Sequence, residues 1–245
     1  MKKGLMVFAL LALLIAGAAW YMLSGAGGFI HTQIEQQGSK YLGSAVSLAK
    51  VELALTQGRM TLSDLRIKNP QGFSSEDAFS VNDITLDLGG ITSQPYVVQT
   101  ISVDAATFLY EVDAGGQGNL IVLKNNLAAN LPQAEKESAA KDGINPLVIV
   151  ENVKVSNVRL KLNFAQLSTG ELKIDTKAYE VTLPTFNAGP IGQPNGMPAN
   201  QVGAAVASAM LDNVIAAAKS EAKKRLAEEA KKKVKEKLKD LLDIG

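Results

Sequence analysis

Hydrophobic positions divide the chain into stretches with three different periods. Residues 5–23 form an unbroken apolar run, residues 46–112 and 146–183 alternate between apolar and polar positions, and residues 199–243 repeat apolar positions about every 3.6 residues. These periods are typical of a membrane-spanning helix, of β-strands and of an amphipathic helix. The pattern therefore predicts a mainly β protein with helices (α+β) and a helix at each end.

The first apolar run has the length and flanks of a membrane anchor. As a helix, Leu5–Leu23 would span roughly 28 Å, close to the hydrocarbon thickness of a bilayer. Lys2 and Lys3 precede the run, and Trp20 and Tyr21 lie at its outer end. Basic residues stay in the cytoplasm and aromatic rings favour the membrane interface, so we expect one pass with the rest of the chain outside.

A cleaved signal peptide is the competing interpretation of this run. The small residues at 16–18 (AGA) match a cleavage-site pattern. The apolar run continues beyond them to residue 23, which is longer than the usual core of a signal peptide and favours a retained anchor.

Changes in composition divide the chain into segments. We expect a cytoplasmic tip, anchor and joint over 1–28, a helix plus curved β-sheet over 29–132, a linker or mobile loop over 133–145, a second strand block of the same sheet over 146–184, a Pro/Gly-rich crossing over 185–198 and a lysine-rich helix over 199–245. Within the second segment, Asn119 is expected to cap a short helix.

A phase slip recurs along the strands. In a motif such as Leu62-Ser-Asp-Leu65-Arg-Ile67, the first two apolar residues are three positions apart, where a flat strand requires two. Similar motifs begin at residues 48, 81, 98, 150 and 155. A β-bulge would restore the apolar face and bend the strand. If neighbouring strands slip at similar heights, the antiparallel sheet predicted here curls into a groove.

An apolar groove of this kind would suit hydrocarbon chains. The candidate lining residues are Val51, Leu53, Leu55, Leu65, Ile67, Ile84, Leu86, Leu160 and Leu162. A sandwich in which strands change sheets is the alternative, because bulges serve both architectures.

The composition narrows the chemistry further. The chain has no cysteine and one histidine, His31, which is expected near the lipid headgroups, and its net charge is +1. Thiolate and multi-histidine metal sites are thereby excluded, and the charge gives no bias toward nucleic acid. No phosphate-loop, HExxH or EF-hand motif occurs. We therefore expect no enzyme, no cofactor and no metal.

The C-terminal helix allows two interpretations. Its lysines could contact anionic headgroups, whereas the interleaved glutamates and aspartates suit a solvated helix that packs on the sheet or on a protein partner.

The order of these parts resembles the N-terminal region of the AsmA family of bacterial inner-membrane-anchored periplasmic proteins. The resemblance rests on the anchor followed by QIEQQGSKYLG at 33–43, VSL at 46–48, GRMTLSDLRIKNPQGF at 58–73 and AFSVNDITLDL at 78–88. It covers roughly residues 1–115. The second strand block is only generally similar, and the lysine-rich helix is not a family feature.

The resemblance implies a single-pass protein of the bacterial inner membrane whose periplasmic β-groove handles phospholipid for envelope lipid homeostasis or outer-membrane biogenesis. Larger relatives are thought to conduct phospholipids along such a groove, but this chain is shorter. A sheet gains only about 4.8 Å per strand, so one groove of this size is not expected to bridge two membranes. Binding lipid, or forming one segment of an assembly, is the narrower expectation. The alternative is an envelope scaffold without a cavity, whose C-terminal helix docks a partner protein.

Overall fold

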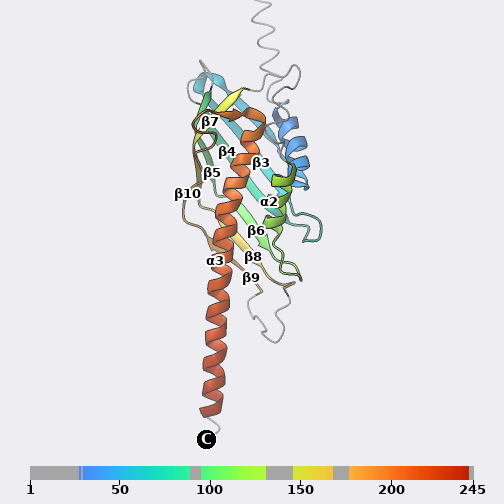
Figure 1. Cartoon of the computed structure of the whole chain (residues 1–245), viewed down its shortest axis with the longest axis vertical. Coiled ribbons are helices and arrows are strands. Elements are labelled where there is room, and N and C mark those ends of the chain that lie inside the picture. Colours follow the sequence, from blue (N-terminus) through green and yellow to red (C-terminus); the bar gives the residue numbers. More distant parts are fainter. Residues whose placement is uncertain (1–27, 29, 89–94, 131–145, 168–176, 243–245) are drawn as a thin grey trace, which may run out of the picture.

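The computed structural model describes residues 28, 30–88, 95–130, 146–167 and 177–242 (Figure 1), while the side chains of residues 55 and 236–242 lie outside that description. The predicted anchor, with Lys2, Lys3, Trp20 and Tyr21, falls outside the described residues, as does the predicted linker at 133–145. Those assignments stay predictions. The described chain begins with a helix over residues 30–42, which we call the N-terminal helix.

In the described part of the chain, eleven strands form one sheet. They are β1 (Val46–Ser47), β2 (Lys50–Ala54), β3 (Arg59–Lys68), β4 (Asp77–Leu88), β5 (Tyr96–Asp104), β6 (Thr107–Glu111), β7 (Leu147–Ser156), β8 (Arg159–Asn163), β9 (Ala178–Thr182), β10 (Phe186–Asn187) and β11 (Met197–Pro198). A short 3-10 helix, η1 (Leu55–Gln57), separates β2 from β3. β1 and β2 pair with β3, β3 pairs with β4, and the order then runs β4-β6-β8-β9 on one path and β4-β5-β7-β10 on the other. The two-sheet sandwich is therefore not the arrangement of these strands.

The sheet is mixed, which corrects the predicted antiparallel sheet. β5 runs parallel to β7, and β6 runs parallel to β8. Between β6 and β7 the chain forms α2 (Asn119–Asn130), the helix expected after Asn119. A connection of this length returns the chain to the end of the sheet where it started, and parallel pairing requires such a crossover.

In the neighbouring strands β3 and β4, the spacing of apolar residues changes from two to three at the same level of the sheet. Leu62 of β3 pairs with Ile84 of β4, and Leu65 pairs with Val81, so the three-residue steps of the two strands lie side by side. Within the step in β3, Asp64 has a φ of 53°. Aspartate tolerates this left-handed conformation better than most side chains, which explains a polar residue at this position of the motif.

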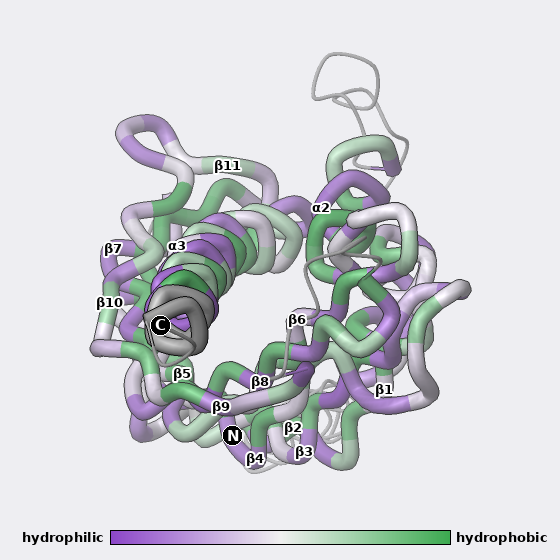
Figure 2. The backbone as a smooth tube through the Cα atoms, turned by 90° about the horizontal axis from the view of Figure 1, so that it is seen from below, coloured by the Kyte–Doolittle hydropathy of each residue, from purple (hydrophilic) through white to green (hydrophobic). Residues whose placement is uncertain are grey.

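The same device recurs where two parallel strands bend. Ala105 separates β5 from β6 and Asn157 separates β7 from β8, and both have a φ of 52°. The Asp104 carboxylate joins the two bends, because it accepts hydrogen bonds from the Ser156 hydroxyl at 2.6 Å and the Asn157 amide at 2.8 Å. These hydrogen bonds lower the pKa of Asp104. Viewed along the long axis, the strands curve round α2 and α3 (Figure 2).

The predicted C-terminal helix is α3 (Ala199–Leu242). Its first half packs on α2, β6, β7, β8 and β11, with Val214 and Ala218 fully buried, and its second half extends beyond the sheet (Figure 1). Among the described residues, α3 is the one helix long and apolar enough to cross a bilayer, over Ala199–Lys235. The buried side chains show that much of this apolar surface serves the protein core.

The bend at Ala105 generates a stability prediction. A Cβ in the left-handed conformation costs roughly 1–2 kcal/mol, whereas glycine adds roughly 0.5–1 kcal/mol of unfolded-state freedom. We therefore expect Ala105→Gly to raise the free energy of unfolding by about 0.5–1 kcal/mol, measured by urea denaturation. Ala178→Gly, at an exposed strand position with an ordinary φ, should lower it instead. A destabilised Ala105→Gly would contradict this account.

Candidate functional site

Apolar side chains form continuous rows across the inner face of the sheet. Directly paired residues of neighbouring strands point to the same face, so the register defines these rows. They run Leu53–Met60–Leu86–Ile101–Val153, then Val51–Leu62–Ile84–Val103–Val155, then Val46–Ile67–Phe79–Phe108–Leu160–Val181. The rows join strands from residue 46 to residue 181 into one apolar surface.

α2 and α3 cover one part of this surface, while the N-terminal helix contributes Ile34, Tyr41 and Leu42 to the core near Val46. α3 packs over β6, β7 and β8, and α2 packs over β6. Beneath them Val153, Val155 and Leu160 have no exposed area, and Leu162 is 1% exposed. The protein's own side chains therefore fill the inner face over β6–β8.

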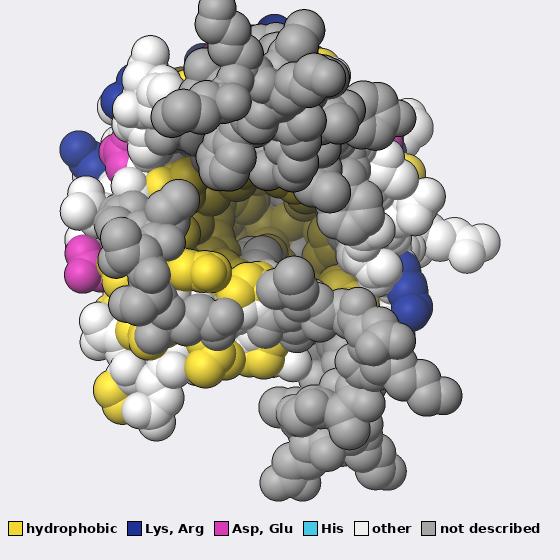
Figure 3. Space-filling model, turned by 90° about the horizontal axis from the view of Figure 1, so that it is seen from above, with side chains coloured by type: hydrophobic (Ala, Val, Ile, Leu, Met, Phe, Trp, Pro, Cys, Tyr) yellow, Lys and Arg dark blue, Asp and Glu magenta, His cyan; other side chains and the backbone are white. Residues whose placement is uncertain are grey.

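The other half of the inner face, over β2–β4, is partly exposed. We call it the open trough and define it by residues Val51, Leu53, Met60, Leu65, Ile67, Leu86 and Leu88, which pack against the core without being buried by it. Viewed from the upper end of Figure 1, the molecule has a hollow lined mainly by hydrophobic side chains (Figure 3). α2 and α3 add the partly exposed Ile121, Val202 and Val206 to the same core.

The structure divides the predicted groove residues. Those in the open trough are Val51, Leu53, Leu65, Ile67 and Leu86, whereas Ile84 is 8% exposed. Leu160 has no exposed area and Leu162 is 1% exposed, so the protein's own side chains cover both of them in the core. Leu55 lies in η1, and its side chain is outside the described part.

The open trough also contains residues outside the predicted groove set. Met60 and Leu88 follow the alternating pattern of their strands but are not among the predicted groove residues. Met60 joins the trough because it lies between Leu53 and Leu86, a neighbourhood set by strand register. Val202 and Val206 were predicted only as members of the apolar stripe of the C-terminal helix.

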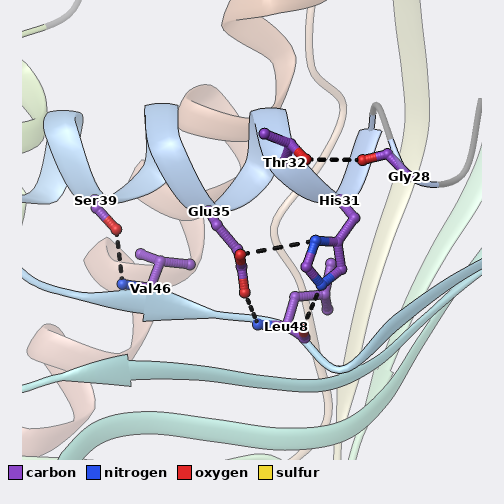
Figure 4. Close-up of polar contacts among 7 residues, drawn as sticks. All are labelled: Gly28, His31, Thr32, Glu35, Ser39, Val46 and Leu48. Carbon is purple, nitrogen blue, oxygen red and sulfur yellow. Dashed lines mark hydrogen bonds and ion pairs between the residues drawn. The ribbon is translucent and has the colours of Figure 1, made fainter.

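The N-terminal helix seals the outer edge of β1 with side chains spaced four residues apart (Figure 4). Ser39 Oγ accepts a hydrogen bond from the Val46 N–H at 2.9 Å, and Glu35 Oε1 accepts one from the Leu48 N–H at 2.8 Å. His31 Nε2 donates to the Leu48 carbonyl at 2.6 Å. Four residues of a helix rise about 6 Å, and two residues of a strand rise about 6.7 Å. The spacing of Glu35 and Ser39 along the helix therefore matches the spacing of the Leu48 and Val46 N–H groups along the strand. We call these three side chains the edge ladder.

A buried carboxylate ties the β3–β4 loop to α2. Glu111 is 2% exposed, and its Oε2 accepts hydrogen bonds from the Ser74 hydroxyl at 2.6 Å and the Asn69 amide at 3.1 Å. Asn119 donates to Asn69 Oδ1 at 2.6 Å and accepts from the Glu111 N–H at 2.9 Å. Every one of these contacts holds backbone segments together, so the cluster is structural. A glutamate within the apolar run at 108–112 was the sequence signal for it.

Other polar side chains of the strands pair with one another. Asp83 accepts a hydrogen bond from Ser63 at 2.7 Å, and Asp87 pairs with Arg59 at 3.5 Å. A shallow depression of about 310 Å³ lies by Thr100, Lys154 and Asn187, where the Asn187 amide is already bonded to Asn152. Within the described ranges, no group of three or more histidine or acidic side chains is placed to hold a metal ion.

Tyr179 of β9 marks the point where α3 leaves the sheet. The Arg225 guanidinium lies 4.9 Å from the centre of its ring, and no described residue hydrogen-bonds its hydroxyl. Burial, together with the nearby Glu221 carboxylate, raises the pKa of Tyr179 to about 12, although Arg225 acts in the opposite direction.

No family model matches the sequence, and no curated protein or solved structure gives a significant match to the chain. The resemblance to the AsmA family therefore stays a prediction.

The edge ladder generates a second stability prediction. Glu35→Ala leaves the Leu48 N–H without its acceptor and should lower the free energy of unfolding by about 1–2 kcal/mol. Glu35→Gln keeps a carbonyl oxygen and should lose less. Gln36→Ala, at the exposed neighbouring position, should change stability by less than about 0.5 kcal/mol in the same urea titration. Equal losses for residues 35 and 36 would contradict the ladder.

Tyr179 generates a pH prediction. Its proton stays bound to a higher pH in the folded protein than in the unfolded chain, so the contribution of Tyr179 is complete below about pH 10 and is lost as pH rises toward 12. Urea denaturation should therefore show stability falling more steeply over this window in the wild type than in Tyr179→Phe. The difference between the ultraviolet titration curves of the wild type and Tyr179→Phe should give the pKa of the Tyr179 phenol, with a midpoint near 12. A midpoint near 10 would contradict the burial of Tyr179.

Proposed function

We propose that the protein is a non-enzymatic, AsmA-like protein of the bacterial inner membrane that holds lipid acyl chains in its open trough. Its domain would lie in the periplasm, and its role would be envelope lipid homeostasis or outer-membrane biogenesis. The observation that carries the proposal is the continuous apolar inner face whose β2–β4 half is left partly exposed. Contiguous exposed apolar surface of this kind typically marks a binding site.

The direction of the N-terminal helix supports this use of the trough. His31 lies beside Leu48 and Ser39 beside Val46, so the helix begins toward the end of the sheet that β2 reaches at Leu53. The joint at 24–28 can span at most about 18 Å. With the predicted anchor in a bilayer, the hollow in Figure 3 would open toward that bilayer.

Energetics favour an acyl chain as the occupant. Moving a methylene group from an apolar environment into water costs about 0.8 kcal/mol, so a free chain in the periplasm is strongly disfavoured. An apolar trough next to the bilayer replaces one apolar environment with another. The same exchange covers the exposed side chains of the trough, so both partners lose contact with water.

A scaffold that docks a partner through α3 is the second candidate. Two observations favour it: the inner face over β6–β8 is filled with protein, and the second half of α3 exposes Leu226 and Val234. In this case the trough would be too shallow to retain lipid.

A matched set of charge insertions tests the lipid proposal. Leu53→Asp places a carboxylate in the open trough and should reduce co-purifying lipid at least about tenfold, which corresponds to 1.4 kcal/mol. It should leave folding largely intact, because Leu53 is partly exposed. Leu160→Asp buries the charge in the core and should destabilise the fold by more than about 4 kcal/mol.

The full chain is purified in mild detergent and its lipid content is measured by mass spectrometry. Gln57→Asp, an exposed position close to β2, is the control for added charge. All variants keep the same anchor, so lipids around the anchor cancel in the comparison. Folded Leu53→Asp that retains the wild-type amount of lipid would leave only the scaffold.

A further inference from the structure

The second half of α3 has an uneven distribution of charge. We call residues 219–235 the stem; Leu226 is 45% exposed and Val234 is 59% exposed. Successive residues of an α-helix are about 100° apart, so their directions follow from the sequence. One half of the circumference carries Lys219, Lys223, Leu226, Ala227, Ala230, Lys231, Lys233 and Val234, and we call it the lysine face.

All the acidic residues of the stem lie on the opposite half. Glu221, Glu228 and Glu229 are there, together with Lys224, Arg225, Lys232 and Lys235. The lysine face thus carries four positive charges and no negative charge, whereas the opposite half carries four positive and three negative charges, a net of +1. The lysine face holds most of the stem's net charge and both of its exposed large apolar side chains.

Contacts at the sheet establish which half faces outward. Arg225 lies over the Tyr179 ring of β9, and Glu221, Glu228 and Glu229 are close enough to raise the Tyr179 pKa. The mixed-charge half therefore faces the sheet. The lysine face, on the other side of the helix, is directed away from it, and most of its residues are exposed.

We propose that the lysine face binds the anionic surface of a lipid bilayer. Long lysine side chains let their ammonium groups reach headgroups while their stems and the neighbouring apolar groups contact the boundary of the acyl region. A second copy of the stem is disfavoured, because two lysine faces would repel each other. The stem projects from the end of the molecule opposite to the start of the N-terminal helix (Figure 1), so this bilayer would be distinct from the one predicted to hold the anchor.

Vesicle binding by the full chain tests the proposal. The protein is held through its N-terminal segment in nanodiscs of neutral phosphatidylcholine and mixed with separate vesicles of phosphatidylcholine, with or without phosphatidylglycerol. Flotation should recover it with the phosphatidylglycerol vesicles only, and added salt should weaken the binding. Each lysine near an anionic surface contributes about 1 kcal/mol, so Lys223→Gln with Lys233→Gln should weaken binding about 30-fold.

Adjacent residues supply the matched control. Lys224→Gln with Lys232→Gln removes the same charge one position away, on the mixed-charge half, and should weaken binding less than about threefold. Equal losses in the two pairs, or no binding to phosphatidylglycerol vesicles, would overturn the proposal and leave an acidic protein as the partner of this face. Acyl-chain retention is measured separately on the same variants, and it should be unchanged because the stem lies outside the open trough.

Discussion

The inner face of the sheet stays apolar because adjacent strands change phase together. A slip in one strand alone would turn its following apolar residues toward solvent, with a loss of about 1.5–3 kcal/mol for each large side chain. β3 and β4 slip beside each other, and so do β5 and β7, where Val98 pairs with Val150 and Ile101 with Val153. Pairing is thereby conserved across each bend, and the sheet can curve without breaking its apolar rows.

Curvature also decides which part of that face a single helix can cover. α3 is straight, whereas the sheet turns away from it, so α3 buries β6–β8 and leaves β2–β4 partly open (Figure 2). The same rows of apolar side chains thus run through the filled core and through the open trough. The core stabilises the fold, and the trough offers a partly exposed apolar surface. The Glu111 cluster fixes α2 to the β3–β4 loop, which holds the helix and the open strands in a defined relation.

Local sequence patterns predicted most of the helices and strands. The features that these patterns did not predict depend on contacts between segments that are distant in the sequence. The bounds of α3, the start of α2 at Asn119 and the slips at Asp64 and Asn157 all follow from spacing within a few residues. The parallel pairs do not, because they depend on where α2 returns the chain. Alternation placed Leu160 on the correct face but cannot tell that α3 covers it, whereas Leu53 has the same pattern and is left partly exposed.

The edge ladder has a consequence for how these molecules behave at high concentration. The margin of a sheet is a template on which a strand of another molecule can add. At β1 the N–H groups of Val46 and Leu48 and the Leu48 carbonyl are already occupied by Ser39, Glu35 and His31. A foreign strand would first have to displace the whole N-terminal helix, so the helix protects this margin against aggregation as well as stabilising the fold.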